Sequence, residues 1–126
     1  MATEGDILVQ LKTQLVNFLD ELIEMFPNEG DFILYRINIK DRISIHEVMN
    51  YIVVKILPNQ EHIKNKDASF FLQNTTLYEK IDSSTVSYYK KLWLSNKLDN
   101  NDREVMWKWV SSFVFLGNKY VDVKKR

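Results

Sequence analysis

The stretch EGDILVQLKTQLVNFLDELIEMF, residues 4–26, decides the fold class of this chain. Asp6 lies in the first turn, where a carboxylate caps or charges the N-terminus of a helix. Pro27 ends the helix, because proline has no amide hydrogen and disfavours helical geometry in the residue before it. The apolar residues between them recur at intervals of three and four and therefore form one helical stripe: Leu8, Leu11, Leu15, Phe18, Leu19, Leu22 and Phe26.

Two later segments repeat this spacing. Ser44 and Glu47 match the capping-box pattern Ser-x-x-Glu and open a helix that Pro58 interrupts. A last helix is predicted from about Asp102 to Val121, and it is apolar on more than one side, which is typical of a helix in the middle of a bundle. The apolar positions of the two segments are Ile45, Val48, Met49, Ile52, Val53 and Ile56, then Val105, Met106, Trp107, Trp109, Val110, Phe113, Val114, Leu116 and Gly117.

The middle of the chain is less regular. Residues 32–39 favour a short helix capped by Asp31, with a strand as the alternative, because neither set of alternate positions is cleanly apolar. Asp67 is predicted to cap a segment that contains Phe70 and Phe71. One helical turn is expected over residues 77–81, and a further helix over residues 82–97.

The composition agrees with a helical chain. The 126 residues are 45% apolar and include only 3 Gly and 2 Pro, too few turn residues for an all-β sandwich or barrel. We therefore expect one all-α domain over residues 1–126, a compact irregular bundle of five to seven helices with a central C-terminal helix. No signal peptide is visible and no run of 18 apolar residues occurs, so the expected location is intracellular without a membrane span.

Charge is balanced overall but unevenly placed. Residues 1–31 contain seven acids and one base, whereas the remainder contains ten acids and sixteen bases. The two parts either attract each other, within or between chains, or are simply solvated. A formal net charge of zero does not favour broad nucleic-acid binding, which depends on an excess of Lys and Arg.

No catalytic, metal or cofactor site is predicted. The chain has no cysteine, which excludes disulfides, thiolate metal sites and cysteine nucleophiles. His46 and Glu47 begin a pattern like that of zinc proteases, but Asn50 replaces the second histidine that this metal site needs. Asp20 and Glu24 share a helix face, and beside a strong apolar stripe such a pair marks the solvent side.

The best candidate for a partner interface is a set of tryptophans. Trp107 and Trp109 are two residues apart, so they lie on nearly opposite faces of a helix. Both are buried only if the helix is central or if one of them meets a partner. Because tryptophan is enriched among interface anchors, we predict a partner surface at Trp93, Trp107 and Trp109.

A basic and aromatic face is the alternative. The run YYKKLW, residues 88–93, combines stacking and phosphate-binding side chains, although helical phase also assigns its aromatics to the core and its lysines to solvent. The candidate nucleic-acid contacts are Lys90, Lys91, Lys108, Lys119, Lys124, Lys125 and Arg126.

Three stretches carry a family resemblance: FLDELIEMFP at residues 18–27, IKNKDASFFL at 63–72 and VMWKWV at 105–110. Their order resembles small uncharacterised proteins of large nucleocytoplasmic DNA viruses. The resemblance implies an all-helical fold and an infected cell or virion as the setting, and it implies no catalytic residue. The sequence thus predicts a non-enzymatic interaction or structural protein that binds a protein partner or a second copy, with a nucleic-acid-associated regulator as the alternative.

Overall fold

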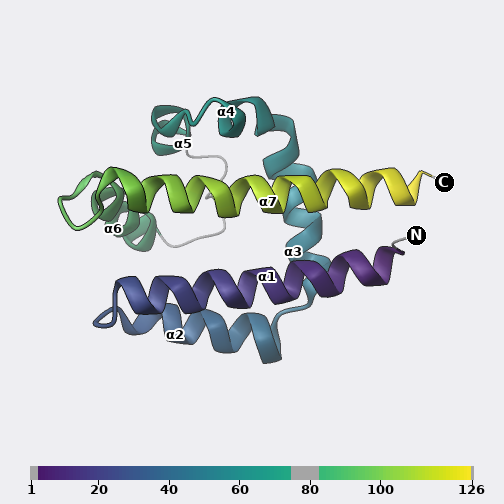
Figure 1. The fold of residues 1–126 in the computed structure, drawn as a ribbon, viewed down its shortest axis with the longest axis horizontal. Helices are drawn as coiled ribbons and strands as arrows, with labels where there is room; N and C mark the ends of the chain where they lie inside the picture. The colour runs from purple at the N-terminus through teal and green to yellow at the C-terminus, as the bar shows by residue number, and fades with distance from the viewer. Residues whose placement is uncertain (1–2, 75–82, 126) are drawn as a thin grey trace. The chain divides into compact units, whose positions relative to one another are not determined.

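The computed structural model describes residues 3–74 and 83–125, and every regular element in those ranges is helical (Figure 1). The all-α fold class is therefore confirmed. The helical turn expected over residues 77–81 lies outside the described residues. In chain order the elements are α1 Glu4–Met25, α2 Gly30–Ile37, a first π turn Asn38–Arg42, α3 Ile45–Tyr51, a second π turn Ile52–Ile56, a 3-10 turn Leu57–Asn59, α4 Gln60–Lys64, α5 Ala68–Gln73, α6 Ser83–Leu94 and α7 Asn100–Lys124.

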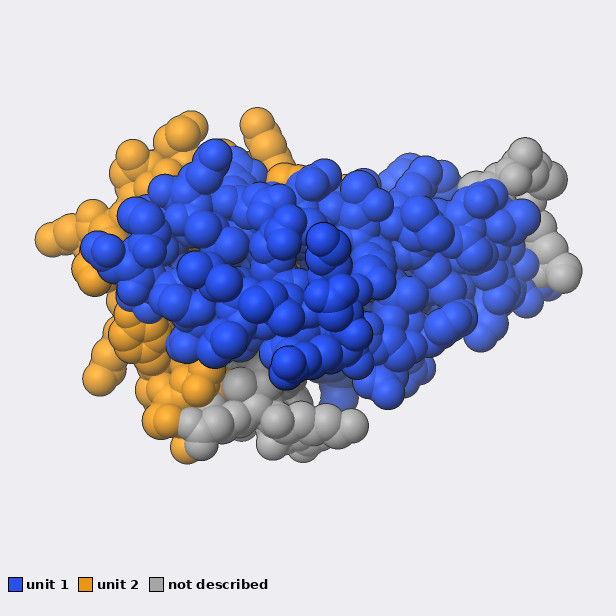
Figure 2. Space-filling view, turned by 90° about the horizontal axis from the view of Figure 1, so that it is seen from below, with its two compact units in different colours: residues 1–57, 113–126 blue, residues 58–112 orange. Residues whose placement is uncertain are grey.

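The chain divides into two compact units, coloured separately in Figure 2. Unit 1 comprises Met1–Leu57 and Phe113–Arg126, and unit 2 comprises Pro58–Ser112. Helix α7 contributes its first half to unit 2 and its second half to unit 1. A single domain over residues 1–126 stays a prediction, and each unit is described by itself.

Unit 1 is built around α1 and α2, which run side by side in opposite directions (Figure 1). Phe26 and Phe32 flank the turn between them, with ring centroids 6.1 Å apart. Pro27 follows α1 directly, as predicted. The largest fully buried side chains of the described residues all belong to this unit: Ile7, Leu11, Met49 and Leu116. Burying such a side chain stabilises the fold by roughly 1.5–3 kcal/mol relative to leaving it in water.

The second half of α7 packs in unit 1 as the central helix that the sequence predicts. Phe113 contacts Phe18 of α1 edge to face, with centroids 5.8 Å apart. Gly117 lies against the second π turn, because a Cβ built there would sit 2.9 Å from Cγ2 of Ile52 and 3.2 Å from Cδ2 of Leu57. Glycine is thus the residue that allows this close approach.

The helix that starts at Ile45 is less regular than predicted. Its last part is the second π turn, and a 3-10 turn that contains Pro58 follows. Proline has no amide hydrogen for the carbonyl four residues earlier and its ring clashes with that carbonyl, so a regular α-helix does not continue through this point. The N-cap is Ser44 as predicted, but its hydroxyl accepts from the amide of His46 rather than from that of Glu47.

Helix starts elsewhere also differ from the predicted ones. Asp31 does not cap α2, because the helix begins one residue earlier at Gly30 and Asp31 lies in its first turn. Asp6 is the inner partner of a capping box whose cap is Thr3, with reciprocal bonds of 3.0 and 3.1 Å. Asp99 and Asp102 form a reciprocal pair of the same kind, because the backbone amide of each donates to the carboxylate of the other. Helix α7 accordingly starts at Asn100 and not at Asp102.

Unit 2 begins with two short helices joined by a tight turn. Helix α4 ends in a Schellman motif, since the amide of Lys66 donates to the carbonyl of Ile63 and that of Asp67 to the carbonyl of His62. Lys66 occupies the left-handed position of this motif with φ 54°, where glycine is usual. Asp67 then caps α5 through the amide of Phe70, as the sequence predicts.

Candidate functional site

An apolar stripe on α2 faces solvent. Ile33, Leu34 and Ile37 are 46%, 59% and 39% exposed, whereas Phe32 on the opposite side of the helix is buried. Residues spaced by three and four lie together on a helix surface, so these three side chains form one patch, the α2 stripe. Figure 2 shows unit 1 from the side on which α2 lies.

Contacts on its inner side hold α2 against α1. Phe32 of α2 meets Phe26 at the end of α1, with ring centroids 6.1 Å apart. Nε of Arg36 donates to Oδ1 of Asp20 on α1 at 2.6 Å. Because these contacts fix the rotation of α2 about its axis, the α2 stripe is kept outward.

Charges of opposite sign flank the α2 stripe along the helix axis. Glu29 and Asp31 lie at its beginning, within one residue of Gly30. Lys40, Asp41 and Arg42 lie at the other end, in the first π turn. The segment is therefore acidic where it begins, apolar along its middle and on balance basic where it ends.

The predicted tryptophan interface lies in unit 2, where two of its members meet. The indoles of Trp93 and Trp107 are 5.6 Å apart at 83°, an edge-to-face arrangement that aromatic pairs favour. Phe71 of α5 extends the cluster, with its centroid 6.2 Å from Trp107. All three rings are half-buried, and so is Trp109. The structure thus brings Trp93 and Trp107 together in a cluster, and their role as a partner surface stays a prediction.

Arg103 joins this cluster to the end of α6. Its Nε and one terminal nitrogen donate to the carbonyl of Trp93 at 3.1 and 2.8 Å, and that nitrogen also donates to the carbonyl of Ser95 at 3.2 Å. The last carbonyls of a helix have no partner within the helix, so a guanidinium from α7 satisfies that of Trp93 here and also binds the carbonyl of Ser95, just after the end of α6.

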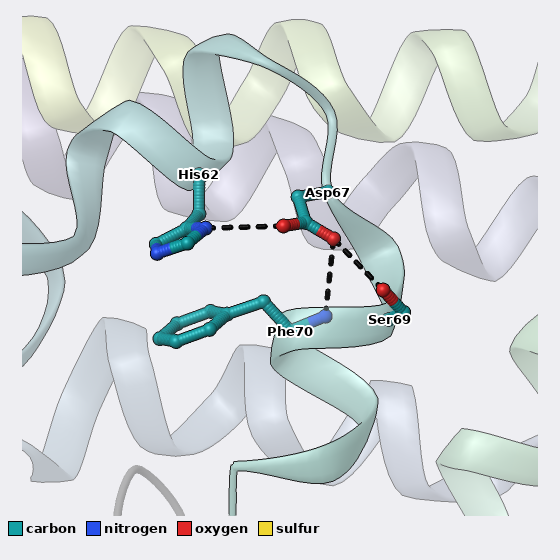
Figure 3. A network of polar contacts seen from close by, with 4 residues as sticks. All are labelled: His62, Asp67, Ser69 and Phe70. Atoms are coloured by element: carbon teal, nitrogen blue, oxygen red, sulfur yellow. Dashed lines mark hydrogen bonds and ion pairs between the residues drawn. The ribbon is translucent and has the colours of Figure 1, made fainter.

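A polar network surrounds the start of α5 (Figure 3). Asp67 accepts from His62 Nδ1 at 3.1 Å, from the hydroxyl of Ser69 at 2.9 Å and from the amide of Phe70 at 3.2 Å. The imidazole of His62 stacks on the ring of Phe70 with centroids 3.7 Å apart and an interplanar angle of 3°. The Ser69 hydroxyl, then the Phe70 amide and then His62 lower the pKa of Asp67, because they favour its charged form. This network ties α4 to α5.

The predicted basic contacts belong to both units. Lys90, Lys91 and Lys108 lie in unit 2, whereas Lys119, Lys124 and Lys125 lie in unit 1, and Arg126 is outside the described residues. On α7, Nζ of Lys119 is 5.3 Å from the ring centroid of Phe115, and Nζ of Lys124 is 5.2 Å from that of Tyr120.

The weaker chemical candidates lie on exposed positions. His46, Glu47 and Asn50 are exposed on α3. Asp20 and Glu24 are exposed on α1, and Asp20 forms an ion pair with Arg36. Across residues 3–74 and 83–125, no group of three or more His, Asp or Glu side chains is arranged to hold a metal ion. Among these same residues, no helix is both long and apolar enough to cross a membrane.

Sequence reasoning missed the α2 stripe. The signal was present, since five of the eight residues of α2 are apolar or aromatic: Phe32, Ile33, Leu34, Tyr35 and Ile37. A helix packed against one neighbour covers only about a third of its circumference, so this content exceeds what α1 buries. The pattern of residues 32–39 favours a short helix, but its apolar content was not compared with what one neighbouring helix covers.

Comparisons with protein-family models, with curated proteins and with solved structures found no match to this chain. The resemblance to proteins of large nucleocytoplasmic DNA viruses therefore stays an expectation.

Proposed function

We propose that this chain is a non-enzymatic interaction protein that docks a protein partner on the α2 stripe. The observation that carries the proposal is the exposure of Ile33, Leu34 and Ile37 on a helix whose other side is fixed to α1. The setting proposed, from the sequence resemblance, is an infected cell or a virion.

The energetics support a docking role. Exposed apolar side chains on one helix face lose contact with water when a partner covers them, at roughly 25 cal/mol per Å² of apolar surface. Helix-in-groove and helix-on-helix recognition use anchors spaced by three and four residues, which is the spacing of Ile33, Leu34 and Ile37. Because α2 is already folded against α1, little ordering entropy is lost on binding.

Site-specific photo-crosslinking tests the proposal. A benzophenone amino acid is placed at Leu34 in the full chain, and the matched control carries it at Asn17, an exposed polar position on α1 of the same unit. Both proteins are irradiated in an extract of the cells in which the protein occurs. Discrete adducts are expected at Leu34 and none at Asn17.

Competition tests whether the adducts formed at Leu34 are specific. An excess of unmodified chain is expected to remove the Leu34 adducts with other proteins, while adducts between two copies of the chain persist. An excess of the Leu34→Asp variant is expected to leave both kinds of adduct, because its charge opposes burial in an apolar contact. Adducts of equal yield at both positions, or no adducts at either, would overturn the proposal. Circular dichroism of each protein verifies that it is folded.

A second candidate function is nucleic-acid binding through α7, and Phe115 favours it. Its ring is 60% exposed and lies beside the ammonium group of Lys119, so an aromatic face and a cation are presented together. Binding of single-stranded oligonucleotides is expected to weaken steeply with added salt and to weaken in Phe115→Ala. Binding that is indifferent to salt contradicts this candidate.

A further inference from the structure

The occupant of the α2 stripe follows from the charges at its two ends. We infer that it is the α2 stripe of a second copy of this chain, packed antiparallel about a two-fold axis. This inference rests on the proposed function, because it names the partner for the same surface.

Charge complementarity selects the antiparallel arrangement. A two-fold axis near the middle of α2 places the beginning of one helix opposite the end of the other. Glu29 and Asp31 of each copy then face Lys40 and Arg42 of its partner, while Leu34 and Ile37 meet across the axis. Asp41 reduces the positive charge of the basic end but does not reverse it. A parallel pairing would place like charges together at both ends.

The apolar contact is short and also suits a second copy. Three apolar residues on an eight-residue helix cover much less than the roughly 800 Å² per partner of a standard stable interface, so the pairing is weak and reversible. The formal net charge of zero leaves no long-range repulsion between copies to oppose it.

The first test is the mass of the purified full chain by sedimentation equilibrium over a range of concentrations. A monomer–dimer equilibrium is expected, and Leu34→Asp is expected to abolish it. Val9→Ala, which changes another exposed apolar residue of unit 1 on α1, is the matched control and is expected to leave the equilibrium unchanged. Equal dimerisation constants for the natural chain, Leu34→Asp and Val9→Ala would contradict the assignment of the dimer interface to α2.

Charge reversal tests the orientation. One variant, E29K together with D31K, makes both ends of α2 basic, and a second, K40E together with R42E, leaves both ends acidic. Each is expected to self-associate at least about tenfold more weakly than the natural chain, because attraction becomes repulsion at both ends. An equimolar mixture of the two variants is expected to regain association as a heterodimer, which a variant that had merely unfolded does not do.

The outcomes separate this inference from the proposed function. If the chain stays monomeric at every concentration while Leu34 crosslinks specifically to another protein, the second copy is the wrong partner and the docking role stands. If neither association nor specific adducts occur, both fail. If the charge-reversed variants dimerise as well as the natural chain, the antiparallel pairing is wrong.

Discussion

The guanidinium of Arg103 lies over the indole of Trp93, 5.9 Å from the ring centroid, and donates two hydrogen bonds to the backbone carbonyl of that same residue. One side chain of α7 thus holds both the ring and the chain at the end of α6. The planar fork of a guanidinium makes this double contact, whereas a lysine ammonium is a point donor on a flexible stem.

Arg103→Lys is therefore expected to lower the free energy of unfolding by about 1 kcal/mol, although it keeps the charge. All three tryptophans lie in unit 2, so tryptophan fluorescence during urea denaturation reports on this change. Lys97→Gln, at an exposed position between α6 and α7, is the control and is expected to stay within about 0.5 kcal/mol of the natural chain. Equal stability of Arg103→Lys and the natural chain would show that the charge alone suffices.

Lys66 offers a test of backbone strain in the Schellman motif that ends α4. Its φ of 54° places the residue in the left-handed region, where a Cβ is unfavourable. Lys66→Gly is expected to be more stable than Lys66→Ala by about 1 kcal/mol, because both lack the long side chain and only alanine keeps the Cβ.

The opposite order is expected at Lys108, an exposed position inside α7. There, Lys108→Gly is expected to be less stable than Lys108→Ala by about 1 kcal/mol, because glycine gains more conformational freedom on unfolding. Urea denaturation followed by tryptophan fluorescence compares the four variants. The same order at both positions would argue against a left-handed Lys66.

Gly117 tests the close approach of α7 to the second π turn. In Gly117→Ala the new methyl meets Cγ2 of Ile52, a β-branched side chain that cannot rotate away cheaply. Overpacking costs about 1–3 kcal/mol and better helix propensity returns about 1 kcal/mol, so a net loss of about 1 kcal/mol is expected.

Gly30→Ala is the matched control for Gly117→Ala, because nothing lies within 4 Å of a Cβ at Gly30. This variant is expected to be as stable as the natural chain or slightly more stable, since alanine suits the first turn of α2 better than glycine. Thermal unfolding followed by circular dichroism measures both. Greater stability of Gly117→Ala than of Gly30→Ala would rule out the close contact.

The hydrogen bonds of Asp67 predict how the stability of the chain changes at acidic pH. Its pKa is lowered from the ordinary 3.8, so its contribution to stability is fully present above pH 3.8 and is lost as the pH falls below 3.8 through the folded-state pKa. Because the hydroxyl of Ser69 is the largest cause, Ser69→Ala is expected to move the titration midpoint of Asp67 upward, toward 3.8. Carboxyl-carbon NMR titration measures both midpoints. A natural chain that already titrates at 3.8 or above would contradict this account of the network in Figure 3.

Helix boundaries were predicted well where the controlling interactions are local. The end of α1 before Pro27 and the caps at Ser44 and Asp67 depend on backbone geometry within a few residues. The start of α7 was placed two residues late, because Asp99 and Asp102 cap each other and the spacing of apolar residues does not reveal this pair.

The α2 stripe was harder to predict from the sequence than the helix boundaries. The pattern of α2 shows more apolar residues than one neighbour covers, but it does not say that Phe32 turns inward while Leu34 turns outward. That choice depends on the contact of Phe32 with Phe26 and on the ion pair of Arg36 with Asp20, which is sixteen residues away.

The sequence by itself determined that this chain is helical, that α1 stops before Pro27, and that the C-terminal helix is apolar on more than one side, because helical periodicity and backbone chemistry are local properties. Only the tertiary structure decided that Trp93 and Trp107 share a cluster with Arg103 and that Ile33, Leu34 and Ile37 stay uncovered. Those outcomes depend on which distant segments meet, and the energy of each meeting is a sum over packing contacts that residue spacing does not encode.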